Sequence, residues 1–331
     1  MNKQSIIGKS KIILLLIMAI TVVISAIIFG NINVSLIDFF HDDKIAKAII
    51  NLRIIRVSNA FIIGAALSIS GLIYQTILRN QLAEPSILGV SSGAGLGASL
   101  MIFCGLSSKY MFVLPLGAFL GGTVAISIVL VLCSALNARS LFSINLAILI
   151  GVIISNLFSS ALMTLVALAP AGELNSISWW LLGSLEGGNY QNIVFLFNLV
   201  AVTAIVTSLW GRELNLLSID QQLSYNVGIN NMALTVVFLL ISSLLTSLAV
   251  SFSGIIGFVG LIVPHIIRVL WGPNIQKNVW LVFIFGGTFL VFCDLISRVV
   301  LQNRELPVGI ITTGCGGIFF IYLLFKNRRS I

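Results

Sequence analysis

The sequence contains very few charged residues. Only 8% of its 331 residues are Asp, Glu, Lys or Arg, while 58% are hydrophobic. Soluble globular chains carry about 25% charged residues. Charge-free stretches recur along the chain, and each is long enough to cross the roughly 30 Å of hydrocarbon in a bilayer. The composition therefore excludes a water-soluble protein and predicts an integral membrane protein with no room for a separate soluble domain.

Side chains that bind metals or carry out acid–base chemistry are equally scarce. The chain has two histidines, His41 and His265, and no pair of cysteines with C-x-x-C spacing. One histidine without a second ligand nearby is not a metal site, so we expect His265 to have a hydrogen-bonded packing role. The cysteines lie in apolar stretches, where Cys behaves as a small buried hydrophobe; they are Cys104, Cys133, Cys293 and Cys315. No metal site and no disulfide framework is predicted.

Two short matches to enzyme motifs lack the context that their chemistry needs. "IGKS" (7–10) ends like a phosphate-binding loop, but the full pattern requires Gly where this chain has Lys3, and it requires a preceding strand. "GVSSG" (89–93) matches the pattern that presents a nucleophilic serine, here Ser91. That pattern needs a strand-to-helix turn, whereas this stretch opens an apolar helix. We predict no catalytic residue and no ATP site in this chain.

The apolar stretches predict an all-α polytopic membrane protein with about ten transmembrane helices. The stretch 221–267 has no Asp, Glu, Lys or Arg and is too long for one helix. The small residues of "SFSGIIG" (251–257) predict a break within it. The predicted spans are 12–30, 57–77, 87–106, 111–133, 144–169, 192–210, 233–250, 258–270, 279–297 and 308–325.

The positions of the charges predict how these helices are oriented. The net charge is +8, but the basic residues are scattered singly between apolar stretches, as in membrane proteins, rather than gathered for nucleic acid. Both ends of the chain are basic, and an even number of spans places them on one side, so we expect both termini in the cytoplasm. The lysines before the first stretch also outline a secretory signal, but its long apolar run favours an uncleaved first span.

Asp294 is the one acidic residue placed inside a predicted span. An ionisable group within the membrane is a candidate for ion or proton coupling. It also lies four residues before Arg298, on the same face of a helix, where the two can form a local ion pair. We favour the ion pair, because no other acidic residue is predicted within the membrane.

Four separated stretches, taken together, resemble one protein family. Their order and spacing are similar to those of the permease subunits of bacterial ABC importers for iron–siderophore complexes, haem and cobalamin, and the resemblance covers residues 53–325. The stretches are "RIIRVSNAFIIGAALSISGLIYQTILRNQLAEPSILGVSSGAGLGA" (53–98), "RELNLLSIDQQLSYNVGIN" (212–230), "SFSGIIGFVGLIVPHIIRVL" (251–270) and "SRVVLQNRELPVGIITTGCGG" (297–317).

The resemblance implies a single transmembrane permease domain, residues 1–331, in the cell membrane. It implies a passage lined by the fifth and tenth helices, here near 144–169 and 308–325. The implied partners are a second permease subunit, identical or related, two cytoplasmic ATPase subunits that hold ATP and Mg²⁺, an extracytoplasmic substrate-binding protein or lipoprotein, and membrane lipid, but no nucleic acid. This chain is expected to hold no cofactor itself. The expected cargo is a ferric siderophore, with haem and cobalamin open.

The resemblance also gives roles to individual residues. Arg53 and Arg56 fall on the family's R-x-x-R positions. Arg298 falls on the family's arginine upstream of "ELPVG". In family members, arginines at these positions receive acidic residues of the binding protein. The alternative for these arginines is an interfacial position with the charged group extended to water.

The segment 211–232 matches the cytoplasmic loop that forms two short coupling helices against the ATPase. Its pattern supports this independently, with apolar contact residues, an aspartate suited to a helix cap and a glycine suited to a tight turn. The residues expected to couple to the ATPase are Leu214, Leu216, Leu217, Ile219, Asp220 and Gly228.

The chain departs from the family pattern at three places. Gln221 and Gln222 stand where acidic or small residues are usual, and Gln81 and Ile318 stand where proline is common. These changes affect local contacts and helix shape rather than the resemblance to the family.

The alternative function from another class is an ion-coupled secondary transporter, which needs coupling residues near the midplane of the membrane. Apart from Asp294, the sequence offers none.

Overall fold

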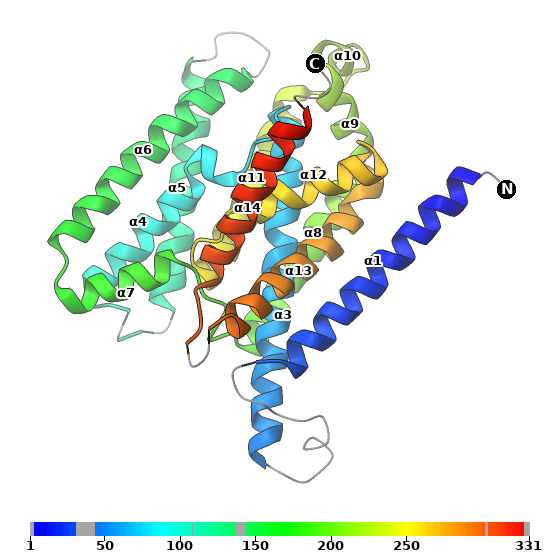
Figure 1. Ribbon diagram of the computed structural model, residues 1–331. Coiled ribbons are helices and arrows are strands. Elements are labelled where there is room, and N and C mark those ends of the chain that lie inside the picture. The colour runs from blue at the N-terminus through cyan, green and yellow to red at the C-terminus, as the bar shows by residue number, and fades with distance from the viewer. Residues whose placement is uncertain are drawn as a thin grey trace.

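A computed structural model describes residues 3–30, 44–107, 109–110, 112–136, 143–301 and 304–327 of the chain. Within these ranges the regular structure is entirely helical (Figure 1). The predicted all-α fold is confirmed. His41 lies outside the described residues.

The helices carry the labels of Figure 1. They are α1 (Lys3–Ile28), α3 (Lys44–Ile77), the 3₁₀ turn η1 (Pro85–Leu88), α4 (Val90–Phe103), α5 (Val113–Leu136), α6 (Ile144–Leu168), α7 (Ala171–Leu181), α8 (Tyr190–Leu209), α9 (Gly211–Ile219), α10 (Gln221–Asn226), α11 (Asn231–Ser253), α12 (Val259–Trp271), α13 (Ile275–Val299) and α14 (Val308–Asn327).

Each of the ten predicted spans falls on one of these helices. Seven helices of the described chain are long and apolar enough to cross a membrane: α1, α3, α5, α6, α8, α11 and α13. The other three predicted spans fall on the shorter apolar helices α4, α12 and α14. The sequence patterns did not predict α7, which has 11 residues with Glu173 in its first turn, because it is too short and too polar to be recognised as a span.

Helix α3 forms the centre of the bundle. It packs against α13, α11, α12 and α8, and 94% of its most apolar segment is buried. Glycines allow its backbone to approach two neighbours closely, because Gly64 faces the carbonyl of Gly286 and Gly71 faces that of Gly260. The helix begins at Lys44, well before the predicted boundary at residue 57. No Gly or Pro interrupts residues 44–63, so the helix continues past the apolar segment, and its first turns project from the bundle in Figure 1.

The predicted break between residues 251 and 257 is confirmed. Helix α11 ends at Ser253, and Gly254 follows with a φ of 68°. The next helix, α12, starts only at Val259 and has 13 residues. In Figure 1, α12 crosses the bundle obliquely instead of continuing α11.

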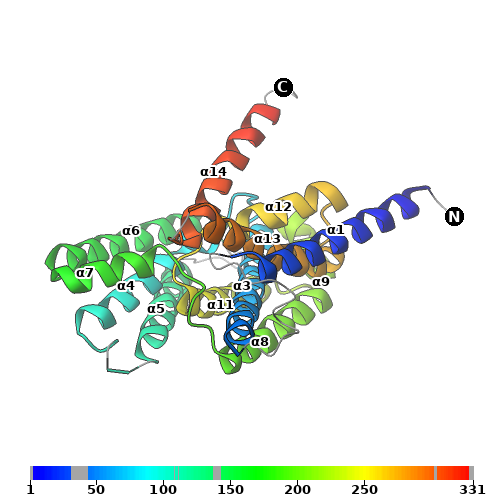
Figure 2. The ribbon, with the colours of Figure 1, turned by 60° about the horizontal axis from the view of Figure 1, so that its bottom comes forward.

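The two ends of the bundle differ in what they carry. Figure 1 shows the start of α1, the end of α14 and the pair α9–α10 toward one end, which we call the α9–α10 end. The first turns of α3 and the last turns of α13 lie toward the opposite end, which we call the network end. Figure 2 shows α14 and α1 leaning away from the other helices, so that much of each surface is uncovered by this chain.

The close approach of α3 and α12 predicts that residue 71 tolerates no side chain. In a Gly71→Ala variant, the added methyl group would collide with the Gly260 carbonyl and push α12 away from α3. We expect a stability loss of at least about 1–3 kcal/mol, measured as a lower thermal midpoint of the purified protein. Gly172→Ala is the control, because nothing lies within 4 Å of the methyl group added there. Equal midpoints for the two variants would contradict this packing.

Candidate functional sites at the two ends of the bundle

A network of charged side chains joins four segments at the network end. Arg56 comes from α3, and Asp294 and Arg298 come from the last turns of α13. Glu305 precedes α14, and Glu186 lies between α7 and α8. We call these five residues the arginine–carboxylate network. It brings together residues that are more than 200 positions apart in the chain.

Arg56 is the residue that links the most segments. Its Nε atom donates to Asp294 Oδ1 at 3.0 Å, and its Nη1 atom donates to Glu305 Oε2 at 2.6 Å. A longer contact of 3.5 Å joins Nη1 to Glu186 Oε1. The Arg56 side chain is 17% exposed and the Glu186 side chain 64% exposed, so the Glu186 contact lies at the rim of the network. Partial burial raises the pKa of Glu186, and the nearby Glu305 carboxyl acts in the same direction.

Asp294 is the buried centre of the network, with no exposed surface. Besides Arg56, it faces Arg298, whose Nε atom lies 3.0 Å from Oδ2 in an ion pair that lacks hydrogen-bond geometry. The local ion pair predicted from the four-residue spacing is therefore confirmed. Each carboxylate oxygen faces a guanidinium group, which offsets the cost of burying the charge.

Arg53 and Arg298 hold the end of α1. Arg53 Nη1 donates to the carbonyls of Ile27 and Ile28 at 3.1 and 2.7 Å. Arg298 Nη2 donates to the Ala26 carbonyl at 3.0 Å. The last carbonyls of a helix have no partner within it, and cations near them are favourable. These arginines supply those partners. The sequence did not reveal the contacts, because the carbonyls are distant from both arginines in the chain.

This packing changes the predicted docking site. Arg53 and Arg298 are only 7% and 3% exposed, and their guanidinium groups are directed to partners within this chain. All three predicted docking arginines do line one cavity of about 200 Å³, together with Gly30 and Glu305. Arg56 has the most exposed side chain of the three and already binds carboxylates. Docking of another protein at these arginines stays a prediction.

The segment 211–232 forms two short helices at the opposite end, as predicted. The predicted helix cap is present, since Asp220 Oδ1 accepts a hydrogen bond from the Gln222 backbone amide at 2.8 Å. The predicted turn is present as well, because Gly228 has a φ of 88°. At that φ, a residue with a side chain would be strained.

Leu214 and Leu217 do not offer an ATPase the direct apolar contact that the sequence suggested, and a part for them in coupling stays a prediction. They are 0% and 1% exposed and belong to the main apolar core of this chain. Three residues apart on α9, they share one helix face, and α9 packs with that face toward α3, α8 and α13. Leu216 is half-buried, and Ile219 is 72% exposed. Sequence reasoning missed the other exposed apolar residues of this surface, Leu223, Tyr225 and Val227. With Ile219 they form what we call the α9–α10 surface.

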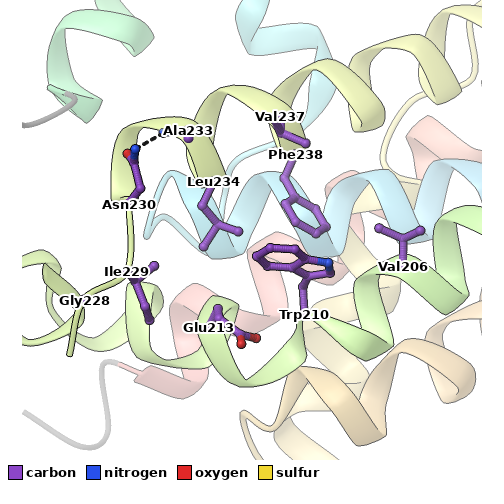
Figure 3. A pocket seen from close by; sticks show the side chains of 10 residues that line it. All are labelled: Val206, Trp210, Glu213, Gly228, Ile229, Asn230, Ala233, Leu234, Val237 and Phe238. Atoms are coloured by element: carbon purple, nitrogen blue, oxygen red, sulfur yellow. Dashed lines mark hydrogen bonds between the residues drawn. The ribbon is translucent and has the colours of Figure 1, made fainter.

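An apolar groove of about 470 Å³ lies beside this surface, between α8, α9 and α11. Figure 3 shows Trp210 and Phe238 along the groove and the Glu213 carboxylate on α9. Asn230 caps α11 there, because its side chain accepts a hydrogen bond from the Ala233 amide at 3.1 Å. Exposed apolar side chains therefore continue from α10 into the groove.

His265 lies outside both sites. Its ring contacts the ring of Phe319 edge-on, with a centroid distance of 5.8 Å, and so joins α12 to α14. Nδ1 of His265 has no hydrogen-bond partner in the structure. The predicted packing role is confirmed, but no hydrogen bond to Nδ1 accompanies it.

Comparison with known proteins matches residues 13–326, nearly the whole chain, to the model of the FecCD transport family. The chain belongs to the FecCD transport family. Among the known proteins to which it is similar is the uncharacterised ABC transporter permease YvrB of Bacillus subtilis. This FecCD chain is 36% identical to YvrB over 291 residues, which is 87% of this chain and 82% of YvrB.

Two further comparisons support the assignment. The hemin transport system permease HmuU of Yersinia pestis is 33% identical, over 85% of this FecCD chain and 84% of HmuU. A solved structure assigned to the metal-chelate type of ABC transporter, in an inward-facing conformation, has 30% identity and a TM-score of 0.85 over 96% of this chain and 99% of that one. The FecCD chain is thus a multi-pass membrane permease component of an ABC transporter.

The arginine–carboxylate network predicts that removing the buried charge of Asp294 lowers the stability of the folded protein. An Asp294→Asn variant would leave Arg56 and Arg298 without their shared counter-charge, and breaking such a buried pair typically costs about 3–5 kcal/mol. We expect a markedly lower thermal midpoint. Glu186→Gln removes the rim contact instead and should change stability by about 0–1 kcal/mol. If both variants unfold at the same temperature, Asp294 is not the centre of the network.

Proposed function

We propose that this chain is the membrane-spanning subunit of an ATP-driven importer in the cytoplasmic membrane and that it carries an iron chelate. A ferric siderophore is the first candidate cargo, and haem and cobalamin are the others. In this proposal two permease subunits, identical or related, enclose the passage. Two cytoplasmic ATPase subunits bind ATP and Mg²⁺, and an extracytoplasmic protein delivers the cargo.

The observation that carries the proposal is the α9–α10 surface. Two short helices, the second capped by Asp220, and the residue that follows them present four exposed apolar side chains at the end of the bundle, and this chain does not cover them. Exposed apolar patches of this kind mark protein–protein contacts. A partner bound here would act directly on the core, because the opposite face of α9 packs against α3 and α13 through Leu214 and Leu217.

The proposed mechanism converts motion of the ATPases into access to the passage. When ATP draws the two ATPases together, each moves an α9–α10 pair, and the buried leucines transmit that movement to the helices behind. The passage would run along α6 and α14. On α14, no atom lies within 4 Å of a methyl group placed at Gly314 or Gly317, so this chain leaves that face open. HmuU, described as a hemin permease, favours an iron-containing cargo, and the metal-chelate assignment of the similar structure favours a metal complex.

The ion-coupled alternative has less support. Its one candidate residue, Asp294, faces a guanidinium group with each oxygen. Both oxygens are thus occupied by guanidinium groups of this chain, so neither is left open to bind a transported cation.

Uptake and coupling are tested together. A strain that lacks the gene should fail to take up one of labelled ferric siderophore, haem or cobalamin, and the wild-type gene should restore uptake.

Ile219→Asp places a charge on the α9–α10 surface. It should abolish co-purification of the ATPase and reduce uptake at least about tenfold, since it buries an unpaired charge in the contact. Tyr110→Asp, which adds the same charge in the α4–α5 connection, should keep the ATPase bound. Retention of the ATPase by Ile219→Asp would refute coupling through this surface.

Docking of the binding protein is tested at Arg56. Arg56→Gln should weaken its association by about tenfold or more, because hydrogen bonds to charged groups contribute about 1.5–3 kcal/mol each. Lys109→Gln removes an exposed charge from the α4–α5 connection and should have little effect. Because Arg56 also pairs with Asp294, the thermal midpoint of each variant must be measured alongside. Unchanged binding by folded Arg56→Gln protein would exclude this arginine from docking.

A further inference from the structure

A basic pocket of about 180 Å³ lies at the α9–α10 end, where α3 and α12 end and α13 begins. We call it the Arg79–Arg268 pocket. Its volume is about six times the roughly 30 Å³ that one water molecule occupies in the liquid. No acidic side chain in the described part of the chain lines it. The lining residues are Leu72, Gln75, Thr76, Arg79, Gln81, Ser218, Arg268, Pro273, Ile275 and Asn278.

Arg268 is held in place by a buried side chain. Gln75 is 3% exposed, and its Nε2 atom donates to the carbonyls of Gly260 and Leu261, both at 3.2 Å. These bonds leave Gln75 Oε1 to accept from Arg268 Nη2 at 3.0 Å. One nitrogen of the guanidinium is therefore fixed, and its remaining N–H groups are available to a ligand.

Arg79 is the unusual member of the pocket. Its Nε and Nη2 atoms are shielded from solvent and have no hydrogen-bond partner. Its backbone has a φ of 47°, in the left-handed region that residues with a side chain seldom adopt. Two shielded guanidinium nitrogens without a hydrogen-bond partner and local backbone strain are both unfavourable, and such features persist mainly where function needs them.

The polar residues that remain in the pocket narrow the choice of ligand. Thr76 and Ser218 already donate their hydroxyl protons to backbone carbonyls, both at 2.7 Å. The carboxamide of Gln81 is exposed and is free to join the two arginines. Partial burial lowers the pKa of Arg79, while the charge of nearby Asp220 acts in the opposite direction. Two guanidinium groups and a carboxamide form a site for a small oxyanion.

We propose that the Arg79–Arg268 pocket binds a phosphate group, supplied by the headgroup of an anionic phospholipid or by free inorganic phosphate. Arginine binds phosphate oxygens through paired N–H groups, and two arginines can share one phosphate group. The pocket lies where α3 and α12 end and α13 begins, and basic pockets between membrane helices bind the headgroups of acidic lipids in other proteins. The bound phosphate supplies the partner that Arg79 lacks.

The test uses the full-length chain purified in a neutral detergent. It is titrated separately with phosphatidylglycerol, phosphatidylcholine and inorganic phosphate. Bound lipid is counted by native mass spectrometry, and the thermal midpoint is recorded for each addition. We expect phosphatidylglycerol or phosphate, but not phosphatidylcholine, to bind and raise the midpoint. A response to phosphatidylglycerol alone assigns the lipid as the source, and a response to inorganic phosphate assigns the free anion.

Variants separate binding from folding. Arg79→Gly and Arg268→Gln should each weaken binding by about tenfold to a hundredfold, while Arg212→Gln, an exposed arginine of α9 outside the pocket, should bind as wild type. Arg79→Gly also relieves the left-handed backbone, so its midpoint without ligand should not fall. If this variant does not fold, Arg79→Lys keeps the charge without the paired N–H groups and should show part of the loss.

Two results would overturn the proposal. One is wild-type protein that binds neither phosphatidylglycerol nor phosphate, and the other is folded pocket variants that bind as wild type. In the first case, loss of ATPase co-purification in Arg79→Gly would assign the pocket to a carboxylate of the ATPase instead.

Discussion

Asp294 carries a full charge with no exposed surface, and the packing of the network end depends on how that charge is compensated. A carboxylate in hydrocarbon is costly unless counter-charges lie against it. Arg56 of α3 and Arg298 of α13 provide them. The same arginines reach Glu305 before α14 and the last turn of α1, so one buried charge fixes the positions of four helices. The charge of Asp294 is therefore compensated by side chains from other parts of this chain rather than by water.

The two ends of the bundle place their charges and apolar groups in opposite ways. At the network end, arginines that could have faced water are turned inward to carbonyls and carboxylates. At the α9–α10 end, apolar side chains such as Ile219 and Val227 face outward instead. A rigid, internally paired end and an end with an uncovered apolar surface suit a protein that receives mechanical work on one side. The α9–α10 surface is joined to the centre of the bundle through α9 itself, which packs against α3, α8 and α13.

Sequence reasoning succeeded where the signal was local. The four-residue spacing of Asp294 and Arg298 predicted their ion pair, and the small residues near Gly254 predicted the break after α11. It failed where the outcome depended on a distant partner. Leu214 and Leu217 have the composition of a contact surface, but which face of α9 turns inward depends on α3, α8 and α13. Likewise, nothing in the sequence places Arg53 beside the end of α1, where its guanidinium group donates to the Ile28 carbonyl.

The sequence by itself determined that this is an all-helical membrane protein, on which segments its long apolar helices lie and to which family it is similar. Low charge, long apolar runs and turn residues act within a few residues of one another, so no knowledge of packing is needed to interpret them. Only the tertiary structure decided which charges are buried together, which leucines are core rather than surface, and that Arg79 and Arg268 share a pocket. Those outcomes depend on contacts between segments far apart in the chain, and helix periodicity alone does not specify which helix a given face will meet.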